Sequence, residues 1–176
     1  MRYWKPVLLA VAIFCAVFCC RPALTADIYL ELGPIKGECE SGGFEEQIEV
    51  ISFVFECEAG ESEGRKGGAR RNDPLPLRPF VFTKRVDSAS PLILQYLWSG
   101  ASLSGNTVLT LSYDDGLKQS ALKIILSNVV VANYSLLGVH GEDPEEEITL
   151  KFEVVRVEHH AGGKMTHSSN APKKDK

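Results

Sequence analysis

Apolar and polar residues alternate with a period of two in several separate stretches of this 176-residue chain. Ile28, Leu30 and Leu32 share one face of an extended segment, and the same pattern recurs within residues 121–132 and 148–157. This period is that of a β-strand with one buried face. The sequence therefore predicts β-strands, and not helices, in these stretches.

Further strands are predicted where β-branched and aromatic residues cluster. The run over residues 48–55 predicts a strand antiparallel to the first, and residues 80–84 predict a short one. Residues 107–113 are followed by Asp114-Asp115-Gly116, a sequence typical of a hairpin turn. Together these stretches predict a mostly β fold, an antiparallel barrel or sandwich of about six or more strands.

A single short helix is predicted after the strand at residues 80–84. Its start motif consists of Asp87, Ser88, Ser90 and Pro91, with a serine as N-cap and the proline at the first helical position. The helix runs through residues 92–98 and ends at Gly100. Because it is apolar on nearly every side, we expect it to be buried, with Leu94 and Leu97 packed against the β core.

The first 26 residues have the three parts of a secretory signal peptide. Two basic residues precede an apolar run over residues 7–20, and small residues follow. The predicted cleavage lies between Ala26 and Asp27, although a permanent membrane anchor is the alternative interpretation. Cleavage removes three basic residues, so the net charge changes from −4 to −7. We therefore expect an exported, periplasmic or extracellular, acidic protein.

The composition of the mature chain predicts one domain followed by a tail. Residues 27–160 are expected to form one domain, and residues 161–176 to form a disordered tail rich in Gly, Ser, Asn and Lys. Within the domain, residues 59–79 are rich in glycine and proline and predict one long loop. We expect either a solvated loop or a candidate assembly loop that reaches an acidic surface on a neighbouring molecule. Its basic residues are Arg65, Lys66, Arg70 and Arg71.

Signal cleavage would leave two of the five cysteines, Cys39 and Cys57. If the first hairpin turns near residue 44, position 39 faces about 49 and position 57 faces about 31, so the two lie ~26 Å apart along the ladder. A disulfide requires Cα atoms within ~7 Å. We expect two unpaired thiols in the monomer, with an intermolecular bridge in an assembly as the alternative.

No residue pattern indicates an enzyme, a metal centre or a cofactor. The cysteines form no repeated CxxC pair, and His159 and His160 are expected on opposite faces of a strand. The carboxylates at 114–115 and 145–147 lie in predicted turns, where solvation explains them. The acidic balance argues against nucleic acid as a partner, and no apolar run reaches the ~20 residues of a permanent membrane span.

Several stretches together carry a resemblance to a known family. They are residues 27–38, residues 48–53, the helix start at 82–92 (Phe-Thr-Lys-Arg-Val-Asp-Ser-Ala-Ser-Pro-Leu), residues 122–124 and the closing strand at 147–152. In this order they resemble the Hcp family, the hemolysin-coregulated tube proteins of bacterial type VI secretion. The resemblance covers residues 27–158, and the helix start is its most specific part.

The resemblance implies a β-barrel with one helix that assembles as a six-membered ring, with rings stacked into a tube. It also implies secretion through a type VI apparatus, effector cargo or apparatus proteins as partners, and no catalytic residues. A second interpretation keeps the β fold but makes the protein an exported monomeric β-sandwich that binds a ligand, a glycan or a partner protein. The mass of the mature protein in solution distinguishes the two.

Overall fold

A computed structural model describes residues 26–58, 77–114 and 119–170 of the chain. The signal segment up to residue 25, the four basic residues of the candidate assembly loop and residues 171–176 lie outside the described residues. In the ranges that are described, no helix is long and apolar enough to cross a membrane.

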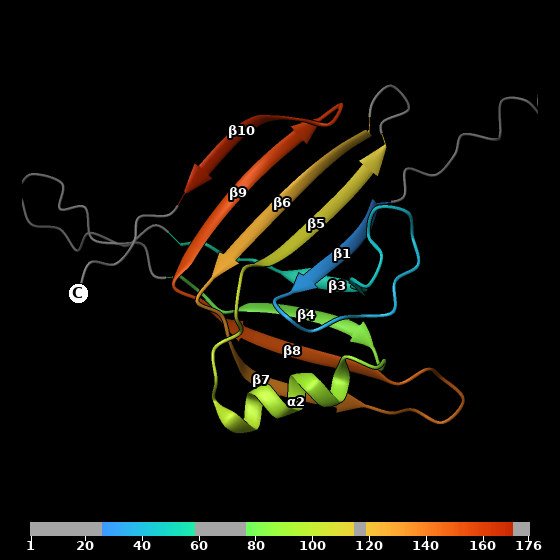
Figure 1. Ribbon diagram of the computed structural model, residues 1–176. Coiled ribbons are helices and arrows are strands. Elements are labelled where there is room, and N and C mark those ends of the chain that lie inside the picture. Colours follow the sequence, from blue (N-terminus) through green and yellow to red (C-terminus); the bar gives the residue numbers. More distant parts are fainter. Residues whose placement is uncertain (1–25, 59–76, 115–118, 171–176) are drawn as a thin grey trace, which may run out of the picture.

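Within the described residues, ten strands form two antiparallel sheets (Figure 1), which confirms the predicted fold class. The first sheet has the order β10-β9-β6-β5-β1-β2 and the second β3-β4-β8-β7. The strands are β1 Ala26–Leu32, β2 Ile48–Glu49, β3 Ser52–Val54, β4 Phe80–Arg85, β5 Thr107–Asp114, β6 Gln119–Ser127, β7 Val130–Leu137, β8 Glu145–Lys151, β9 Val154–Ala161 and β10 Lys164–Asn170.

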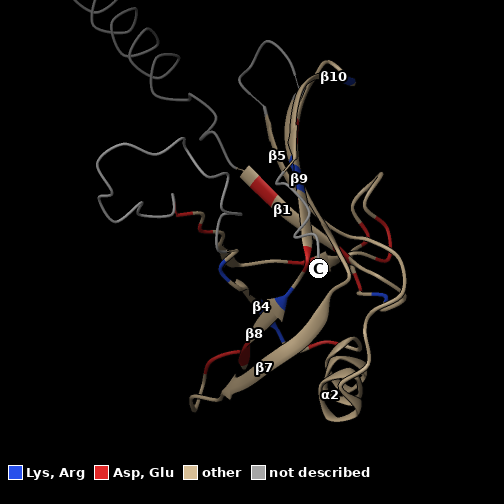
Figure 2. Ribbon diagram, turned by 90° about the vertical axis from the view of Figure 1, so that its left-hand side faces the viewer, with Lys and Arg blue, Asp and Glu red and all other residues tan. Residues whose placement is uncertain are grey.

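The core lies between the inward faces of the two sheets, as the period-two pattern predicts. In the six-stranded sheet Leu30 pairs with Leu109, and Leu109 pairs with Ile124. In the four-stranded sheet Phe80 and Phe82 point the same way, and both are fully buried. Figure 2 shows the first sheet nearly edge-on above the second, with the helix beside the lower sheet.

Three stretches predicted as single strands are each divided between the two sheets. Residues 48–55 become β2 and β3, residues 121–132 become β6 and β7, and residues 148–157 become β8 and β9. Between β6 and β7, Asn128 has a φ of 56°, which turns the chain sharply. The buried positions change phase at this crossing, from Ile124 and Leu126 to Val129 and Val131. Apolar residues on both sides of the shift make the stretch resemble one strand in the sequence.

The predicted disordered tail is wrong for its first part. Residues 164–170 form β10, which pairs antiparallel with β9. Gly162 and Gly163 have φ values of 59° and 76°, the geometry of a tight hairpin turn that glycine adopts without strain. The domain therefore extends beyond residue 160 to at least Asn170. Every residue of β10 is exposed, so no apolar pattern marked the strand in the sequence.

Helix α2 spans Ser90–Ser99 and ends at Gly100, which has a φ of 63° as predicted. Its burial differs from the prediction. Ile93 is the fully buried apolar residue, whereas Leu97 is half-buried against the core and Leu94 is half-buried outside it. Because α2 packs along one side only, mainly on β7, its opposite side is not covered, and Trp98 is 78% exposed.

Candidate functional site

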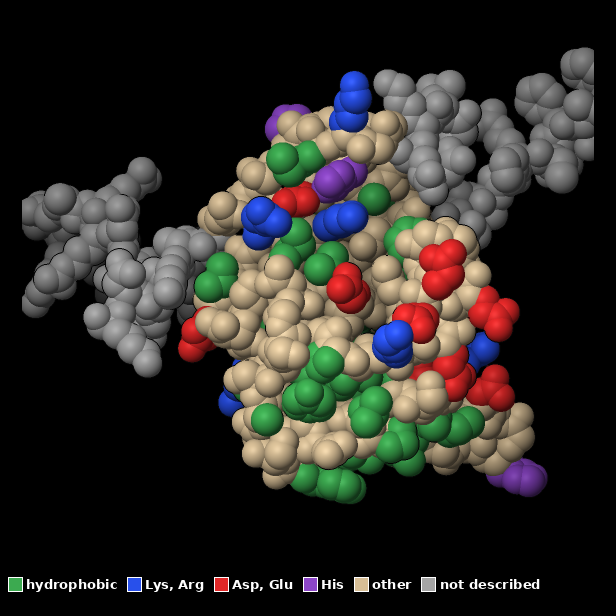
Figure 3. Space-filling model, viewed as in Figure 1, with side chains coloured by type: hydrophobic (Ala, Val, Ile, Leu, Met, Phe, Trp, Pro, Cys, Tyr) green, Lys and Arg blue, Asp and Glu red, His purple; other side chains and the backbone are tan. Residues whose placement is uncertain are grey.

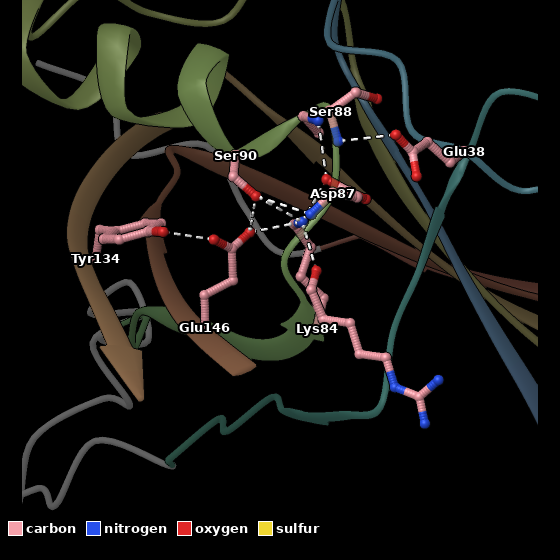
Figure 4. Close-up of polar contacts among 9 residues, drawn as sticks. Glu38, Lys84, Asp87, Ser88, Ser90, Tyr134 and Glu146 are labelled. Carbon is pink, nitrogen blue, oxygen red and sulfur yellow. Dashed lines mark hydrogen bonds and ion pairs between the residues drawn. The ribbon is translucent and has the colours of Figure 1, made fainter. Parts of the chain in front are cut away.

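A buried cation lies between two carboxylates where β4 leads into α2 (Figure 4). The Lys84 side chain is fully buried, and its Nζ is 2.6 Å from both Glu146 Oε1 and Asp87 Oδ1. Glu146 is also fully buried and stands opposite Lys84 in the β4–β8 ladder. A buried charge is tolerated when it is paired and hydrogen-bonded. We call Lys84, Asp87, Ser90, Tyr134 and Glu146 the helix-start cluster.

The helix-start motif takes part in this cluster, but its serine does not act as predicted. The residue before the helix is Ala89, which has no capping side chain, and the proline does lie in the first helical turn. The Ala89 N–H donates to Asp87 Oδ1 at 2.8 Å, and the Asp87 N–H donates to Ser90 Oγ at 3.1 Å. The Asp87 carboxylate therefore accepts from the backbone N–H at the helix start. The Ser90 hydroxyl is free to donate to Glu146 Oε1 at 2.8 Å.

Tyr134 completes the cluster from β7. Its hydroxyl donates to Glu146 Oε2 at 2.5 Å. Burial, followed by the hydrogen bond and the negative charge of Glu146, raises the pKa of Tyr134 to about 12. Both oxygens of Glu146 are thus occupied by donors, and the cluster ties together β4, β7, β8 and α2.

Sequence analysis missed Lys84, Tyr134 and Glu146. Glu146 was assigned to a solvated turn, and this is wrong because it belongs to β8 and faces the core. A signal existed: Glu146 precedes Ile148 and Leu150 at a spacing of two, just as Lys84 follows Phe80 and Phe82. An ionisable residue in phase with a buried face of each strand indicates an internal ion pair.

A groove of about 500 Å³ adjoins the cluster. Glu38 closes one side, because its Oε1 accepts a hydrogen bond at 3.1 Å from the N–H of Ser88, the remaining residue of the helix-start motif. The loop after β1 and the connection from β4 to α2 face each other across this groove. Its lining consists of Glu38, Cys39, Glu49, Val50, Ile51, Arg85, Val86 and Asp87.

Cys39 and Cys57 are both free thiols; Cys39 is buried beside the groove and Cys57 is exposed. The predicted hairpin register, in which position 39 faces about 49, is wrong. Glu49 pairs with Tyr29 and not with position 39. After β2 the chain crosses into the second sheet, where Cys57 forms a bridge with Leu77.

The remaining polar groups form local contacts. His159 contacts the Tyr113 hydroxyl at 3.0 Å and the Thr166 hydroxyl at 2.7 Å, whereas His160 contacts Glu158 at 2.9 Å. The hydrogen bond from His160 lowers the pKa of Glu158, against the opposing effect of burial. Among the described residues no group of three or more His, Cys, Asp or Glu side chains is arranged to hold a metal ion.

Comparison with known proteins places the chain in a family. Residues 29–159 match the family described as "Type VI secretion system effector, Hcp". No curated protein sequence matches the chain. Solved structures of several proteins share the fold, among them three with different sources. A type VI secretion system effector from Yersinia pestis is 20% identical (TM-score 0.65, 82% of this chain and 98% of that one). Hcp1 from Salmonella typhimurium is 22% identical (TM-score 0.63, 82% and 92%).

The third is the secreted protein Hcp3 from Pseudomonas aeruginosa, which is 18% identical with a TM-score of 0.62 and covers 87% of this chain and 100% of that one. The family match includes the helix start and the strands that carry Lys84 and Glu146. The chain therefore belongs to the Hcp family, the tube-forming structural proteins of type VI secretion.

Proposed function

We propose that the mature chain assembles into a six-membered ring, that such rings stack into a tube, and that the protein acts in type VI secretion without a catalytic step. The observation that carries this proposal is the uncovered apolar surface on the helix side of the molecule. Trp98, Leu136 and Leu137 are 78%, 58% and 62% exposed. Figure 3 shows hydrophobic side chains gathered over this region. Apolar surface of this kind marks an interface.

The buried charges of the helix-start cluster have a structural role in this proposal. Lys84 and Glu146 are each held by several partners within the fold and sit away from solvent. Neither side chain is presented to a substrate. The cluster fixes the orientation of α2 on β7, and so it fixes the surface that a neighbouring copy would meet. As a separate part of the proposal, the lumen of the tube would carry an effector protein of the apparatus.

Light scattering on the mature chain, residues 27–176, tests the proposal. A mass six times that of the monomer supports the ring, and a stable monomer at every concentration supports instead an exported binding module. Trp98→Asp is expected to shift the mass toward the monomer. Glu147→Lys on the exposed outer side of β8 is the control, because it changes charge without touching the apolar surface.

Export through the leader is a second part of the proposal. We infer cleavage between Ala26 and Asp27, which leaves a chain that begins within β1. Pairing of β1 with β5 extends from Leu32 to Ala26, so cleavage there removes one residue of the ladder and leaves the rest. N-terminal sequencing of protein taken from the periplasm and from the medium tests it: an intact Met1 in both fractions overturns the cleavage and favours direct type VI export.

A further inference from the structure

The helix-start cluster contains the groups needed to join two of its side chains covalently. Lys84 Nζ lies 2.6 Å from both Glu146 Oε1 and Asp87 Oδ1, and Figure 4 shows the three groups converging. Because a carboxyl C–O bond is about 1.2–1.3 Å long, Nζ is no more than about 4 Å from Glu146 Cδ. Attack by an amine on a carboxyl carbon starts from about 3–3.5 Å. The folded chain therefore holds the two reacting atoms close to the required distance.

We propose that Lys84 and Glu146 form an isopeptide bond within the folded chain, with Asp87 as the acid–base group. The Lys84 amine and the Glu146 carboxyl group condense to an amide, and one water molecule is released. The two residues are directly opposed in the β4–β8 ladder, so the bond cross-links two strands that are distant in sequence. The step requires no oxidant, cofactor or second protein, and it does not depend on assembly.

Burial prepares this pair for reaction. Both side chains are fully removed from solvent. Phe82 and Ile148, which are also fully buried, precede Lys84 and follow Glu146 by two residues on the same faces of their strands. An apolar interior disfavours separated charges. Transfer of one proton from Nζ to Glu146 Oε1 converts the ion pair into a neutral amine and a neutral carboxylic acid, which are the forms that can condense.

The hydrogen bonds of Lys84 orient the amine. Nζ donates to the Arg85 carbonyl at 2.9 Å and to Asp87 Oδ1 at 2.6 Å, and these two bonds can persist when the ammonium loses one proton. The transferred proton is the one that faces Glu146, so the electron pair left behind on Nζ also faces the carboxyl group. Fixed orientation of this kind supplies much of the rate of an intramolecular reaction.

The step balances in atoms and charge. The Nζ–Cδ bond forms while Asp87 Oδ1 takes a second proton from Nζ. Tyr134 donates to Glu146 Oε2 at 2.5 Å, and this donor stabilises the negative charge that develops on Oε2. Asp87 then passes its proton to Oε1, which already has the first proton and leaves as water when the Cδ–Oε1 bond breaks. Nζ keeps one proton as the amide N–H, and Asp87 is again a carboxylate.

The released water has an exit beside Asp87. The Asp87 side chain is 14% exposed and lines the groove next to the cluster, whereas Lys84 and Glu146 are completely covered. A closed site that excludes water also protects the new amide from hydrolysis. The reaction occurs once in each chain and turns over no substrate, so it agrees with a structural role for the protein.

The intact mass of the purified wild-type chain tests the bond. We expect a form that is lighter than the sequence mass by one water, about 18 Da, and its share should grow while the folded protein is incubated. Tandem mass spectrometry of a tryptic digest should then identify a branched peptide in which Lys84 is joined to Glu146. The full sequence mass after prolonged incubation, or a loss of water that maps to other residues, overturns the proposal.

Two variants test the roles of the neighbouring groups. Asp87→Asn keeps an Oδ1 acceptor for the Ala89 N–H but removes the base, and it should slow bond formation about 10²–10⁴-fold. Tyr134→Phe removes the donor to Oε2 and should slow it about 10²–10³-fold. Tyr113→Phe is the matched control, because the Tyr113 hydroxyl contacts His159 outside the cluster. Wild-type rates in both cluster variants overturn the assigned roles.

Lys84→Arg separates the bond from the charge. Arginine keeps a cation between the two carboxylates but has no amine that condenses under these conditions, so this variant should retain the full sequence mass. The same loss of water in Lys84→Arg contradicts the proposal. The peptide map is made on the wild-type chain, so it decides the proposal even if a variant in the cluster fails to fold. A wild-type chain that never assembles contradicts the proposed ring and leaves the bond unaffected, so the two failures are distinguishable.

Discussion

Lys84 Nζ lies 2.6 Å from Glu146 Oε1, and both side chains are fully removed from solvent between neighbouring strands. Removing one partner of such a pair leaves an uncompensated buried charge. The ion pair between Lys84 and Glu146 therefore stabilises the fold at the start of α2.

Lys84→Met should lower the free energy of unfolding by about 3–5 kcal/mol, because Glu146 and Asp87 lose their shared cation. Denaturant unfolding of the purified chain measures it. Lys36→Met is the matched control. Its partner is Glu46, and both side chains are largely exposed, so less than about 1 kcal/mol is expected. Equal losses in the two variants would show that burial of the Lys84 pair has no special effect.

Ile93→Ala should destabilise the protein by about 2–5 kcal/mol, since Ile93 is the fully buried apolar side chain of α2. Leu94→Ala should cost clearly less, because Leu94 is half-buried and lies outside the core cluster. Melting temperatures of the two variants, compared with wild type, decide the order. A larger loss for Leu94→Ala would restore the sequence-based assignment of Leu94 as the helix core residue.

Tyr134 should ionise only at high pH. Its pKa of about 12 in the fold lies above the ordinary value of 10.0, so its hydroxyl stabilises the fold fully below pH 10 and loses this effect as the pH rises toward 12. Ultraviolet difference spectroscopy follows the titration. Glu146→Gln should lower the pKa of Tyr134, because it removes the adjacent negative charge; an unchanged titration would place the cause elsewhere.

Gly37→Ala should disrupt the loop after β1. The Gly37 N–H donates to the Glu46 carbonyl, and an added Cβ would lie only 2.7 Å from the Ile48 Cα, which is backbone and cannot move aside. We expect a loss of about 1–3 kcal/mol in unfolding free energy. Gly42→Ala in the same loop meets no atom within 4 Å and serves as the control. The comparison fails to support the close approach if both variants unfold at the same denaturant concentration.

The thiols should be distinguishable by their rate of alkylation. Cys57 is exposed and should react at once, whereas Cys39 is buried and should react only when the fold opens. Intact mass after labelling without reductant is expected to show one label in native buffer and two in denaturant for the mature monomer. Two unlabelled cysteines in denaturant would show a disulfide.

The sequence was sufficient for the class of fold, because alternation identifies the buried face of each strand wherever that face is continuous. It was insufficient for the sheet boundaries. The buried positions change phase where the chain passes from one sheet to the other, from Leu126 to Val129 and from Leu150 to Val155, and apolar residues on both sides conceal this shift. The strand β10 was missed for the opposite reason: it is held by backbone pairing with β9, and none of its side chains is buried.

The site was predicted in part. Asp87 and Ser90 were recognised at the helix start, but their partners are distant in sequence, and Glu146 lies 56 residues from Ser90. No local pattern specifies that contact. Three consecutive glutamates are typical of a solvated turn, yet in β8 the middle one, Glu146, faces inward while Glu147 is exposed.

The passage of the chain between the two sheets also bears on how the protein folds. Both sheets contain pairs of neighbouring strands, but each is joined by strands distant in sequence: β1 pairs with β5 and β6 with β9 in the first sheet, and β4 pairs with β8 in the second. Topologies dominated by distant pairings fold slowly, on the order of milliseconds to seconds. Slow folding suits the export proposed above, because a chain that stays unfolded for longer after synthesis can still thread a narrow membrane channel.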